Sequence, residues 1–586
     1  MNQLSSSLAN WHALNRRLAA KIMAECSFEG CLTPEPLDEG RYRLMASGHC
    51  YDFLARPTAW GWLRIRPGSL TRNGAPLTSA SELILDCAPQ LAMDDITLGN
   101  FLEELNNTLA GDAQQQAALA GRRAAELLDL PAGKLEGLLD GHPKALASRG
   151  RLGWGQDDMQ QWAPESTRNF RLRWLAVRLA EGVTVHGRPD PEQCLHPEEL
   201  STFRRDFPAL EWALMPVHPW QWQRYIRPQY AARFASGDLV DLGLAGPSWR
   251  PQASIRTLSN TRDASSCDLK LSLTILNTSC YRGIPPASMT VAPGLSAWLA
   301  RLVGHDPELL VRGLTVQKEL GGIHVAQGGQ ERIPGTPYRY RETLAAVWRE
   351  SLPSKTGANE QGFLLATLMQ TDGQGQPLIA EMIRRSGLCA EDWVIRLFDR
   401  VTIPLYHLLC RYGIGLVAHG QNLGLILDRW RPARVVIKDF HGDLRAADSS
   451  LPERAGVPGN LLAHLTRLPP AHLFHDLYTG HLVTTLRFVS PLLEEEPGLP
   501  ESHFYRLLAE RVRAYQQQHP ELWESFRQFD LLRPSVERVC INRARFRIGY
   551  GDDARRPLPE LGIPLNNPLS DHGLSFDPMI KETSHD

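Results

Sequence analysis

The sequence predicts an α+β fold, in which helical and strand-like segments occupy separate stretches of the chain. Two Ala/Leu-rich segments, Leu98–Leu109 and Gln114–Leu128, carry apolar residues at helical spacing. By contrast, Leu269–Leu276 alternates apolar with other residues, which is typical of a half-buried strand. Leu423–Leu427 and Val435–Ile437 are short apolar runs on either side of a turn-like segment, and they predict a β-hairpin.

Composition and charge indicate a globular protein without a nucleic-acid or membrane partner. The chain has 586 residues, 43% of them hydrophobic and 22% charged, which is enough for two to four domains. A net charge of −2 gives no overall attraction to nucleic acid or to an anionic membrane. The N-terminal residues Trp11, Leu14, Leu18 and Ile22 have helical spacing, and no run approaches 18 apolar residues. We therefore expect a cytoplasmic location.

Three successive parts of the chain differ in character. Residues 1–135 are mainly helical, with one strand hairpin at Tyr42–Ile65. Residues 136–355 mix aromatic residues, prolines and short β-branched runs, which favours an α+β domain. The low hydrophobicity of Ser351–Gly362 marks the boundary to the third part, residues 356–586.

The third part begins with a predicted strand around Leu364–Leu368. A predicted helix follows at Glu391–Tyr412, with a kink at Pro404 and an end at Gly413. After the hairpin, further helices are expected over Pro452–Gln528. The last thirty or so residues are rich in Pro, Gly and Asn, and we expect them to be irregular.

Two polar motifs lie at the same end of the predicted hairpin. His-Gly-Gln-Asn covers residues 419–422 and Lys-Asp-Phe-His-Gly-Asp covers residues 438–443, so His419, Asn422 and Asp439 should converge. An amide oxygen and a carboxylate are ligands that Mg²⁺ takes when it also binds phosphates, and a histidine can donate to an anionic oxygen. Taken singly, each motif can also be a turn or a loop cap. Together they indicate nucleotide-triphosphate chemistry.

A second group of polar residues surrounds the predicted strand at Leu269–Leu276. Guanidinium groups and hydroxyls in this pattern suit a small polycarboxylate, because arginine binds a carboxylate with two parallel hydrogen bonds. A solvated strand edge is the structural alternative. The group comprises Ser254, Arg256, Lys270, Thr278, Ser279 and Arg282.

A third cluster places a histidine and cations in a glycine-punctuated loop. Gly-His-Pro-Lys at residues 141–144 is followed by Arg149 and Arg151, a combination that suits phosphate binding or a solvated surface. His-Pro-Trp-Gln at residues 218–221 is distinctive, but we interpret this proline-locked aromatic turn as architecture.

In combination, these motifs resemble those of the siderophore synthetases that work independently of nonribosomal peptide synthetases, and most of all the aerobactin-synthetase branch. The motifs that carry the resemblance are Gly-His-Pro, His-Pro-Trp-Gln, Asn-Thr-Ser-Cys-Tyr-Arg-Gly, His-Gly-Gln-Asn and Lys-Asp-Phe. The resemblance covers essentially the whole chain. It implies a cupped-hand architecture: a thumb (1–135), fingers (136–355) and a palm (356–586), with ATP bound in the cleft between fingers and palm. A homodimer is also expected.

The resemblance assigns roles to the polar residues of the three clusters. The carboxylate substrate and the adenylate are expected to meet Ser254, Arg256, Thr278, Ser279, Arg282 and His419. ATP is expected to meet His142, Arg149, Lys270, Asn422 and Asp439, with Mg²⁺ bound by Asp439 and Asn422. The expected catalytic residues are His419, Arg282 and Lys270.

This chain departs from the family pattern at two places. Many relatives have an acidic residue two positions before the histidine of His-Gly-Gln-Asn, where this chain has Val417. The corresponding carboxylate is either missing or supplied by Asp443. Relatives often carry a second His-Pro and then a lysine after Gly-His-Pro; here Ala145-Leu146 and Arg149 stand at those places, so the positive charge is kept.

The resemblance implies an ATP-dependent carboxylate–amine ligase. A carboxylate of citrate or of a citryl-monoamide would attack the α-phosphorus of ATP, and an amine such as N6-acyl-N6-hydroxylysine would then form an amide and release AMP. A free-citrate-using member of the same family is one alternative. A small-molecule kinase is another, although Gln421 stands where phosphotransferases have a proton-accepting aspartate. An ATP-binding regulatory protein is the third.

Overall fold

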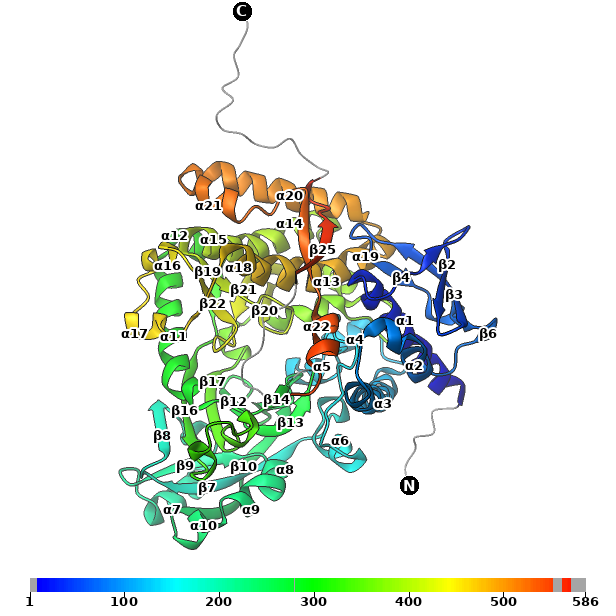
Figure 1. Ribbon diagram of the computed structural model, residues 1–586. Helices are drawn as coiled ribbons and strands as arrows, with labels where there is room; N and C mark the ends of the chain where they lie inside the picture. The colour runs from blue at the N-terminus through cyan, green and yellow to red at the C-terminus, as the bar shows by residue number, and fades with distance from the viewer. Residues whose placement is uncertain (1–7, 279, 552–560, 571–586) are drawn as a thin grey trace, which may run out of the picture.

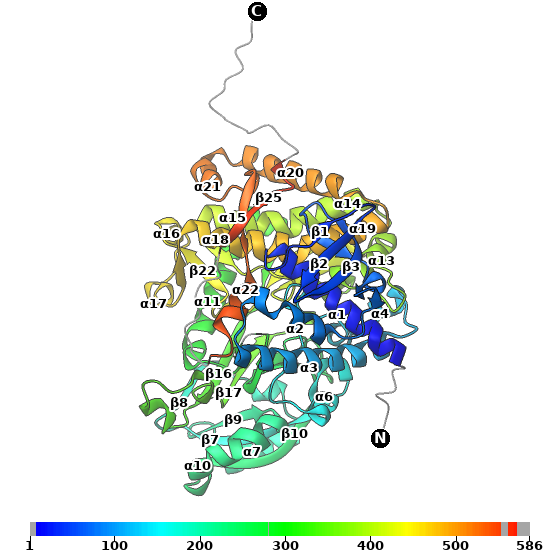
Figure 2. The same ribbon diagram turned by 45° about the vertical axis from the view of Figure 1, so that its right-hand side comes forward.

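The computed structural model describes residues 8–278, 280–551 and 561–570. Figures 1 and 2 show a large antiparallel sheet at one end of the molecule and a layer of helices, including α20 and α21, at the other. The N-terminal helices α1 to α3 lie at the side, between these two ends. No helix among the described residues has both the length and the apolar character needed to cross a bilayer.

The N-terminal part packs helices against a small sheet. The predicted spacing is confirmed, because Leu14, Leu18 and Ile22 of α1 are buried. The sheet has the order β1-β2-β3-β5-β6, with β4 paired to β3. The elements are α1 (Leu8–Phe28), β1 (Glu35–Pro36), β2 (Arg41–Ala46), β3 (His49–Pro57), β4 (Leu63–Ile65), β5 (Thr71–Arg72), β6 (Ala75–Pro76), α2 (Ala80–Leu91), α3 (Asp95–Leu119), α4 (Ala124–Leu128) and α5 (Ala132–Gly137).

The helix prediction for residues 98–128 is only partly right. The segment Leu98–Leu109 lies inside the single helix α3, which continues to Leu119. The second predicted helix, Gln114–Leu128, is therefore wrong as a unit. The chain turns at Gly121, whose φ of 73° is costly for residues with a side chain, and α4 starts only after this turn.

The middle part is built on an eight-stranded sheet in which all neighbouring strands are antiparallel. The order is β8-β16-β17-β12-β11-β10-β7-β9. Its buried side includes Trp174, Trp249 and Trp348, and α11 (Pro286–His305) packs against β16. The strands are β7 (Phe170–Arg178), β8 (Val183–Gly187), β9 (Trp212–Val217), β10 (Leu239–Pro251), β11 (Thr257–Asn260), β12 (Cys267–Leu271), β16 (Glu319–Val325) and β17 (Ala345–Glu350).

The predicted single strand Leu269–Leu276 is wrong. The chain leaves the large sheet at Ser272, so β12 ends at Leu271 and a new strand, β13 (Leu273–Asn277), pairs with β14 (Cys280–Arg282). All five residues of β13 are buried. The alternation of residues in the sequence therefore does not mark a solvent-exposed and a buried face of β13, because protein covers both faces.

The predicted β-hairpin is confirmed. Strands β20 (Leu423–Asp428) and β21 (Arg431–Ile437) are antiparallel, with Leu423 opposite Ile437, and they join β15 (Leu314–Val316) and β18 (Glu360–Leu364) in a four-stranded sheet. The strand predicted at residues 364–368 is wrong, because β18 ends at Leu364 and residues 365–369 form a 3₁₀ turn.

The predicted helix over residues 391–412 exists in three pieces. These are α14 (Ala390–Leu397), a π-helical turn (Phe398–Thr402) and α15 (Ile403–Tyr412), and Gly413 ends the helix with a φ of 60°. Pro404 is the second residue of α15, directly after the π-helical turn. The irregularity predicted at this proline therefore takes the form of a π-helical turn just before it.

The predicted helices after the hairpin are confirmed. The prediction of an irregular C-terminal segment is wrong for residues 561–566, because β25 (Leu561–Asn566) pairs there with β24 (Ser535–Val539). Between these two strands, α22 (Ile541–Ile548) lies beside the N-terminal helix α1 (Figures 1 and 2). The remaining elements of this region include β19 (Ile414–Leu416), β22 (Leu444–Ala447), β23 (Thr466–Leu468), α18 (Pro470–Leu477), α19 (Arg487–Glu495), α20 (Glu501–Gln518) and α21 (Trp523–Gln528).

Candidate active site

A cavity of about 800 Å³ opens where the three parts of the chain meet. Its walls come from α1, the loop after α5, the turns around β13 and β14, the 3₁₀ turn after β18, the start of the hairpin, and α19. The predicted site residues that line it are His142, Arg149, Ser254, Thr278, Arg282 and His419. Arg256, Lys270, Asn422 and Asp439 are not among the lining residues. Ser279 lies outside the described residues.

Two histidines meet in this cavity, although 277 positions separate them in the sequence (419 minus 142). The rings of His142 and His419 are edge to face, with 5.9 Å between their centroids. Burial lowers the pKa of both residues, and the pKa of His142 lies well below its usual value. Two neutral imidazoles therefore stand side by side.

Each of these rings has its Nδ1 atom engaged by the backbone. His142 Nδ1 accepts a hydrogen bond from the N–H of Ala145 (3.1 Å), and His419 Nδ1 accepts one from the N–H of Gln421 (3.3 Å). A neutral imidazole carries one proton, so the proton of each ring is on Nε2. Both side chains are thus hydrogen-bond donors suited to an anionic oxygen.

Arg282 and Ser254 hold unsatisfied polar atoms at the cavity. The Nη2 atom of Arg282 donates to the carbonyl of Asn277 (2.8 Å) and to the hydroxyl of Thr278. Its Nε atom and the Ser254 hydroxyl are buried without a hydrogen-bond partner among the described residues. Since buried polar atoms normally find partners, these two are the positions at which a ligand oxygen is expected.

Lys270 and Asp439 belong to an ion-pair cluster next to the cavity. The carboxylate of Asp439 accepts from Lys270 (2.8 Å) and from Arg349 (3.1 Å). Burial alone would raise the pKa of Asp439, but these two cations outweigh it and hold the pKa well below its usual range. Arg256 donates to the carbonyl of Gly283, and burial lowers its pKa.

The amide of Asn422 is oriented by its neighbours. Its nitrogen donates to the carbonyl of Val417 (3.0 Å) and to the carboxylate of Asp443 (3.1 Å), and these two contacts fix the orientation of the amide. Asp443 also lines the cavity. Val417 stands at the position where many relatives have an acidic residue. Asp443 is therefore in a position to supply the carboxylate that Val417 lacks.

The donor set fits Mg²⁺ that arrives with a nucleotide better than a resident metal. Among residues 8–278, 280–551 and 561–570 there is no group of three His, Cys, Asp or Glu side chains that could hold an ion. The amide oxygen of Asn422 and the carboxylates of Asp439 and Asp443 are hard oxygen donors. Mg²⁺ takes one or two carboxylates and completes its octahedron with water and phosphate oxygens.

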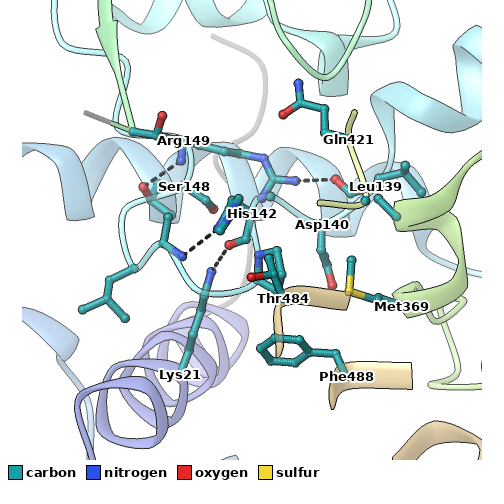
Figure 3. A pocket seen from close by; sticks show the side chains of 18 of the residues that line it. Lys21, Leu139, Asp140, His142, Ser148, Arg149, Met369, Gln421, Thr484 and Phe488 are labelled. Carbon is teal, nitrogen blue, oxygen red and sulfur yellow. Dashed lines mark hydrogen bonds between the residues drawn. The ribbon is translucent and has the colours of Figure 1, made fainter. Parts of the chain in front are cut away.

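The arginines of the third cluster are committed to protein partners. Arg149 donates to Asp112 and to the carbonyl of Leu139 (2.8 Å), and Figure 3 shows it lying across the cavity wall. Burial would lower the pKa of Arg149, but Asp112 and Glu165 raise it. Arg151 forms a buried bidentate pair with Glu165. A phosphate contact by Arg149 stays a prediction.

Two other motif residues are structural. Lys144 is buried, donates to the carbonyl of Val539 (3.0 Å) and lies 3.8 Å from Glu29. Gln221 of the His-Pro-Trp-Gln motif donates to the Thr274 hydroxyl (2.8 Å) and to the carbonyl of Thr343 (2.9 Å). The interpretation of that motif as architecture is confirmed.

Sequence reasoning missed the wall that α1 contributes. Arg17 and Lys21 of this helix line the cavity, as does Asp140, which pairs with Arg17 at 2.8 Å. The two basic residues are four positions apart, so a helix places them on one face. The sequence does not indicate that this face meets the cavity, because that depends on how α1 docks.

Comparison with known proteins extends over nearly the whole chain. A family model described as the IucA/IucC family matches residues 132–370, and one described as a ferric iron reductase FhuF-like transporter matches residues 391–554. An aerobactin synthase of Escherichia coli is 39% identical over 96% of this chain and 98% of its own length.

Solved structures show the same fold. Aerobactin synthetase IucC from a hypervirulent pathotype of Klebsiella pneumoniae has a TM-score of 0.86 at 36% identity, with 96% of this chain and 99% of that chain covered. ATP-bound aerobactin synthetase IucA from the same pathotype has a TM-score of 0.75 at 18% identity, covering 94% and 99%.

Proposed function

The chain belongs to the IucA/IucC family, the siderophore synthetases that work independently of nonribosomal peptide synthetases, and from this we propose its reaction. It is an ATP-dependent carboxylate–amine ligase of siderophore biosynthesis. The acid is a citrate that already carries one amide, and the amine is a hydroxamate-bearing amine such as N6-acyl-N6-hydroxylysine. The products are an amide, AMP and pyrophosphate.

One observation carries this proposal: the cavity is lined by two kinds of hydrogen-bond donor that suit anions. Arg282 and Ser254 present buried donor atoms that have no partner among the described residues. His142 and His419 are neutral rings that carry their proton on Nε2. A carboxylate and a triphosphate are both anions, so an enzyme that joins them needs such donors for both at one place.

In the first step a carboxylate oxygen of the acid forms a bond to the α-phosphorus of ATP, and pyrophosphate leaves with the electrons of the broken P–O bond. Arg282, Ser254 and His419 hold the acid and the adenylate that forms from it, while His142 donates to the phosphate oxygens as charge builds on them. Preorganised donors of this kind are each worth about 10²–10³ in rate.

Mg²⁺ would be held by Asp439, Asn422 and Asp443, and when bound it neutralises phosphate charge. Lys270 and Arg349 already fix the carboxylate of Asp439 in this place. In the second step the amine nitrogen bonds to the acyl carbon, and AMP leaves. Closing the cavity on the adenylate keeps water away from it between the two steps.

We further propose the larger arrangement. Residues 1–135, 136–355 and 356–586 form the thumb, fingers and palm of a cupped hand, with ATP in the cleft between fingers and palm. The enzyme works in the cytoplasm, where ATP is available, as a homodimer. Contact between α22 and α1 joins residues of the first and the last of these parts.

Isotope exchange tests the proposed reaction. With the acid and ATP but no amine, labelled pyrophosphate should exchange into ATP, because the first step is reversible. Hydroxylamine should then trap the acyl group as a hydroxamate. A citrate that carries one amide should support both signals better than free citrate. Stronger signals with free citrate would overturn the choice of acid, and ADP in place of exchange would overturn adenylation.

A further inference from the structure

The wall of the cavity that α1 forms contains a lysine, Lys21, that makes no ion pair with any described residue. Its Nζ atom donates to the backbone carbonyl of His142 at 2.9 Å, as Figure 3 shows. A carbonyl is a neutral partner, so this contact fixes the position of the amine without neutralising its charge.

The charged groups around Lys21 are satisfied by one another. Asp112 on α3, Glu25 on α1 and Asp140 in the loop after α5 all favour its charged form, and Arg149 opposes it. These groups are nevertheless paired: Arg17 with Asp140, Arg149 with Asp112, and Arg487 with Glu25. On the α1 wall, the side-chain nitrogen of Lys21 is therefore available to a ligand.

Burial makes the neutral amine of Lys21 accessible near physiological pH. It lowers the pKa of Lys21 from its ordinary value to about 8, although Asp112, Glu25 and Asp140 act in the opposite direction. A neutral Lys21 can keep its hydrogen bond to His142, because only one of its hydrogens is needed there. Its lone pair is then free on the cavity side.

A second cavity beside the first offers space for the acceptor amine. Its volume is about 860 Å³, and Arg17, Gln370 and Thr371 line both cavities. Arg17 lies one helical turn before Lys21 on α1. The second cavity carries neutral amide side chains, including Gln114, Gln156 and Gln160, which suit the neutral arm of a hydroxamate-bearing amine.

We infer that Lys21 is the general base of the second half-reaction, taking the proton that the acceptor nitrogen loses as the amide forms. This inference rests on the proposed function. The neutral acceptor nitrogen forms a bond to the acyl carbon, the bond from that carbon to the phosphate oxygen breaks, and AMP leaves with its electron pair. One proton passes from the nitrogen to Lys21 Nζ, and Lys21 later returns it to solvent.

Comparison of two acceptors tests this role. Lys21→Met and Lys21→Arg should both lower amide formation with an alkylamine acceptor by about 10²–10⁴-fold. In Lys21→Arg, pyrophosphate exchange without acceptor should stay within about twofold of wild type, because arginine can still donate to the carbonyl of His142. This result would show that the fold and the first step are intact. Trapping by hydroxylamine should persist, because hydroxylamine is an uncharged and strong nucleophile at neutral pH and needs no base. Arg16→Met, on another face of α1, is the matched control.

The pH profile gives a second readout. In the wild type, the single-turnover rate of aminolysis should rise as pH passes through about 8, because Lys21 must lose its proton before it can accept one. In both Lys21 variants, the aminolysis rate should no longer show this rise near pH 8. Arginine keeps the charge but cannot act as a base, since its pKa is above about 12.

Three results would overturn the inference. Full aminolysis in Lys21→Arg would show that only the charge matters. Equal losses with hydroxylamine and with the alkylamine would show that Lys21 serves the adenylate and not the acceptor. Loss of exchange would place Lys21 in the first step. A wild-type enzyme without exchange is a different outcome, because it would overturn the proposed function itself and this inference with it.

Discussion

At the scale of single residues, the polar atoms that line the cavity differ from those of the neighbouring ion-pair cluster in how they are satisfied. Arg282 and Ser254 keep buried atoms without partners among the described residues, whereas Asp439, in the cluster, is engaged by Lys270 and Arg349. An unsatisfied buried atom costs stability until a ligand meets it. Arg282 and Ser254 are therefore suited to bind substrate. Lys270 and Arg349 are suited to hold the carboxylate of Asp439 in one position.

Arg282→Lys should weaken recognition of the acid while leaving ATP binding nearly unchanged. Lysine keeps the charge but loses the planar fork, and with it the buried Nε–H. Because a hydrogen bond to a charged group is worth about 1.5–3 kcal/mol, kcat/KM for the acid should fall about tenfold to a hundredfold. Steady-state kinetics with each substrate varied in turn checks this, with exposed Arg301→Lys as the control. Equal losses for ATP and acid would place Arg282 at the phosphates.

Asp439→Asn should fold and yet lose most activity. Each cation keeps a second acid, because Lys270 lies 3.7 Å from Glu319 and Arg349 lies 3.4 Å from Asp268. The rate should fall about 10²–10³-fold, with partial recovery at high Mg²⁺ because an amide is a weaker ligand. Turnover measured against Mg²⁺ concentration checks this.

The control for that variant is Asp428→Asn, which changes an exposed carboxylate at the turn end of the same hairpin. It should behave as wild type throughout the Mg²⁺ titration. Full activity of Asp439→Asn at limiting Mg²⁺ would show that this carboxylate does not bind the metal.

At the scale of elements, the hairpin places His419 by close contact with the 3₁₀ turn after β18. A Cβ atom added to Gly420 would lie 2.9 Å from the Cα and N atoms of Ala366, and the N–H of Ala366 donates to the carbonyl of Gly420 at 3.0 Å. The backbone of both segments would have to move apart. Glycine is therefore required beside the histidine for steric reasons.

Gly420→Ala should lower both stability and adenylation. Overpacking at such a contact costs about 1–3 kcal/mol, and the displaced loop would carry His419 out of line. Thermal unfolding and pyrophosphate exchange should both register the change. Gly335→Ala, where an added Cβ meets nothing within 4 Å, should leave both unaltered. An unchanged exchange rate in Gly420→Ala would mean that the position of His419 does not depend on this contact.

Elements specified by local sequence were predictable, and those specified by distant partners were not. The hairpin follows from two apolar runs and a short turn, and the helix end at Gly413 follows from a glycine in the left-handed region. The break at Ser272 was not predictable, because it depends on which protein segments cover β13. The pairing of β25 with β24 was not predictable either, because β25 lies in a segment rich in Pro, Gly and Asn and becomes a strand by pairing with β24.

At the scale of the whole molecule, the cavity exists only when distant parts of the chain come together. Glu29, just after α1, accepts hydrogen bonds from the N–H groups of Ile541, Asn542 and Arg543 at 2.9 to 3.1 Å, which ties the two ends of the chain beside the site. Motifs pointed to six residues that line the cavity, since each motif is contiguous. They could not identify Lys21, which reaches the cavity only through this tertiary docking.

The most direct test of adenylation follows one oxygen atom. If the acid is supplied with ¹⁸O in its carboxylates and the reaction is run to completion with ATP and amine, the attacking oxygen stays on phosphorus when the amide forms. Mass spectrometry should therefore find one ¹⁸O atom in AMP and none in pyrophosphate. Label in inorganic phosphate with ADP as the nucleotide product, or AMP without label, would contradict attack of the carboxylate on the α-phosphorus of ATP.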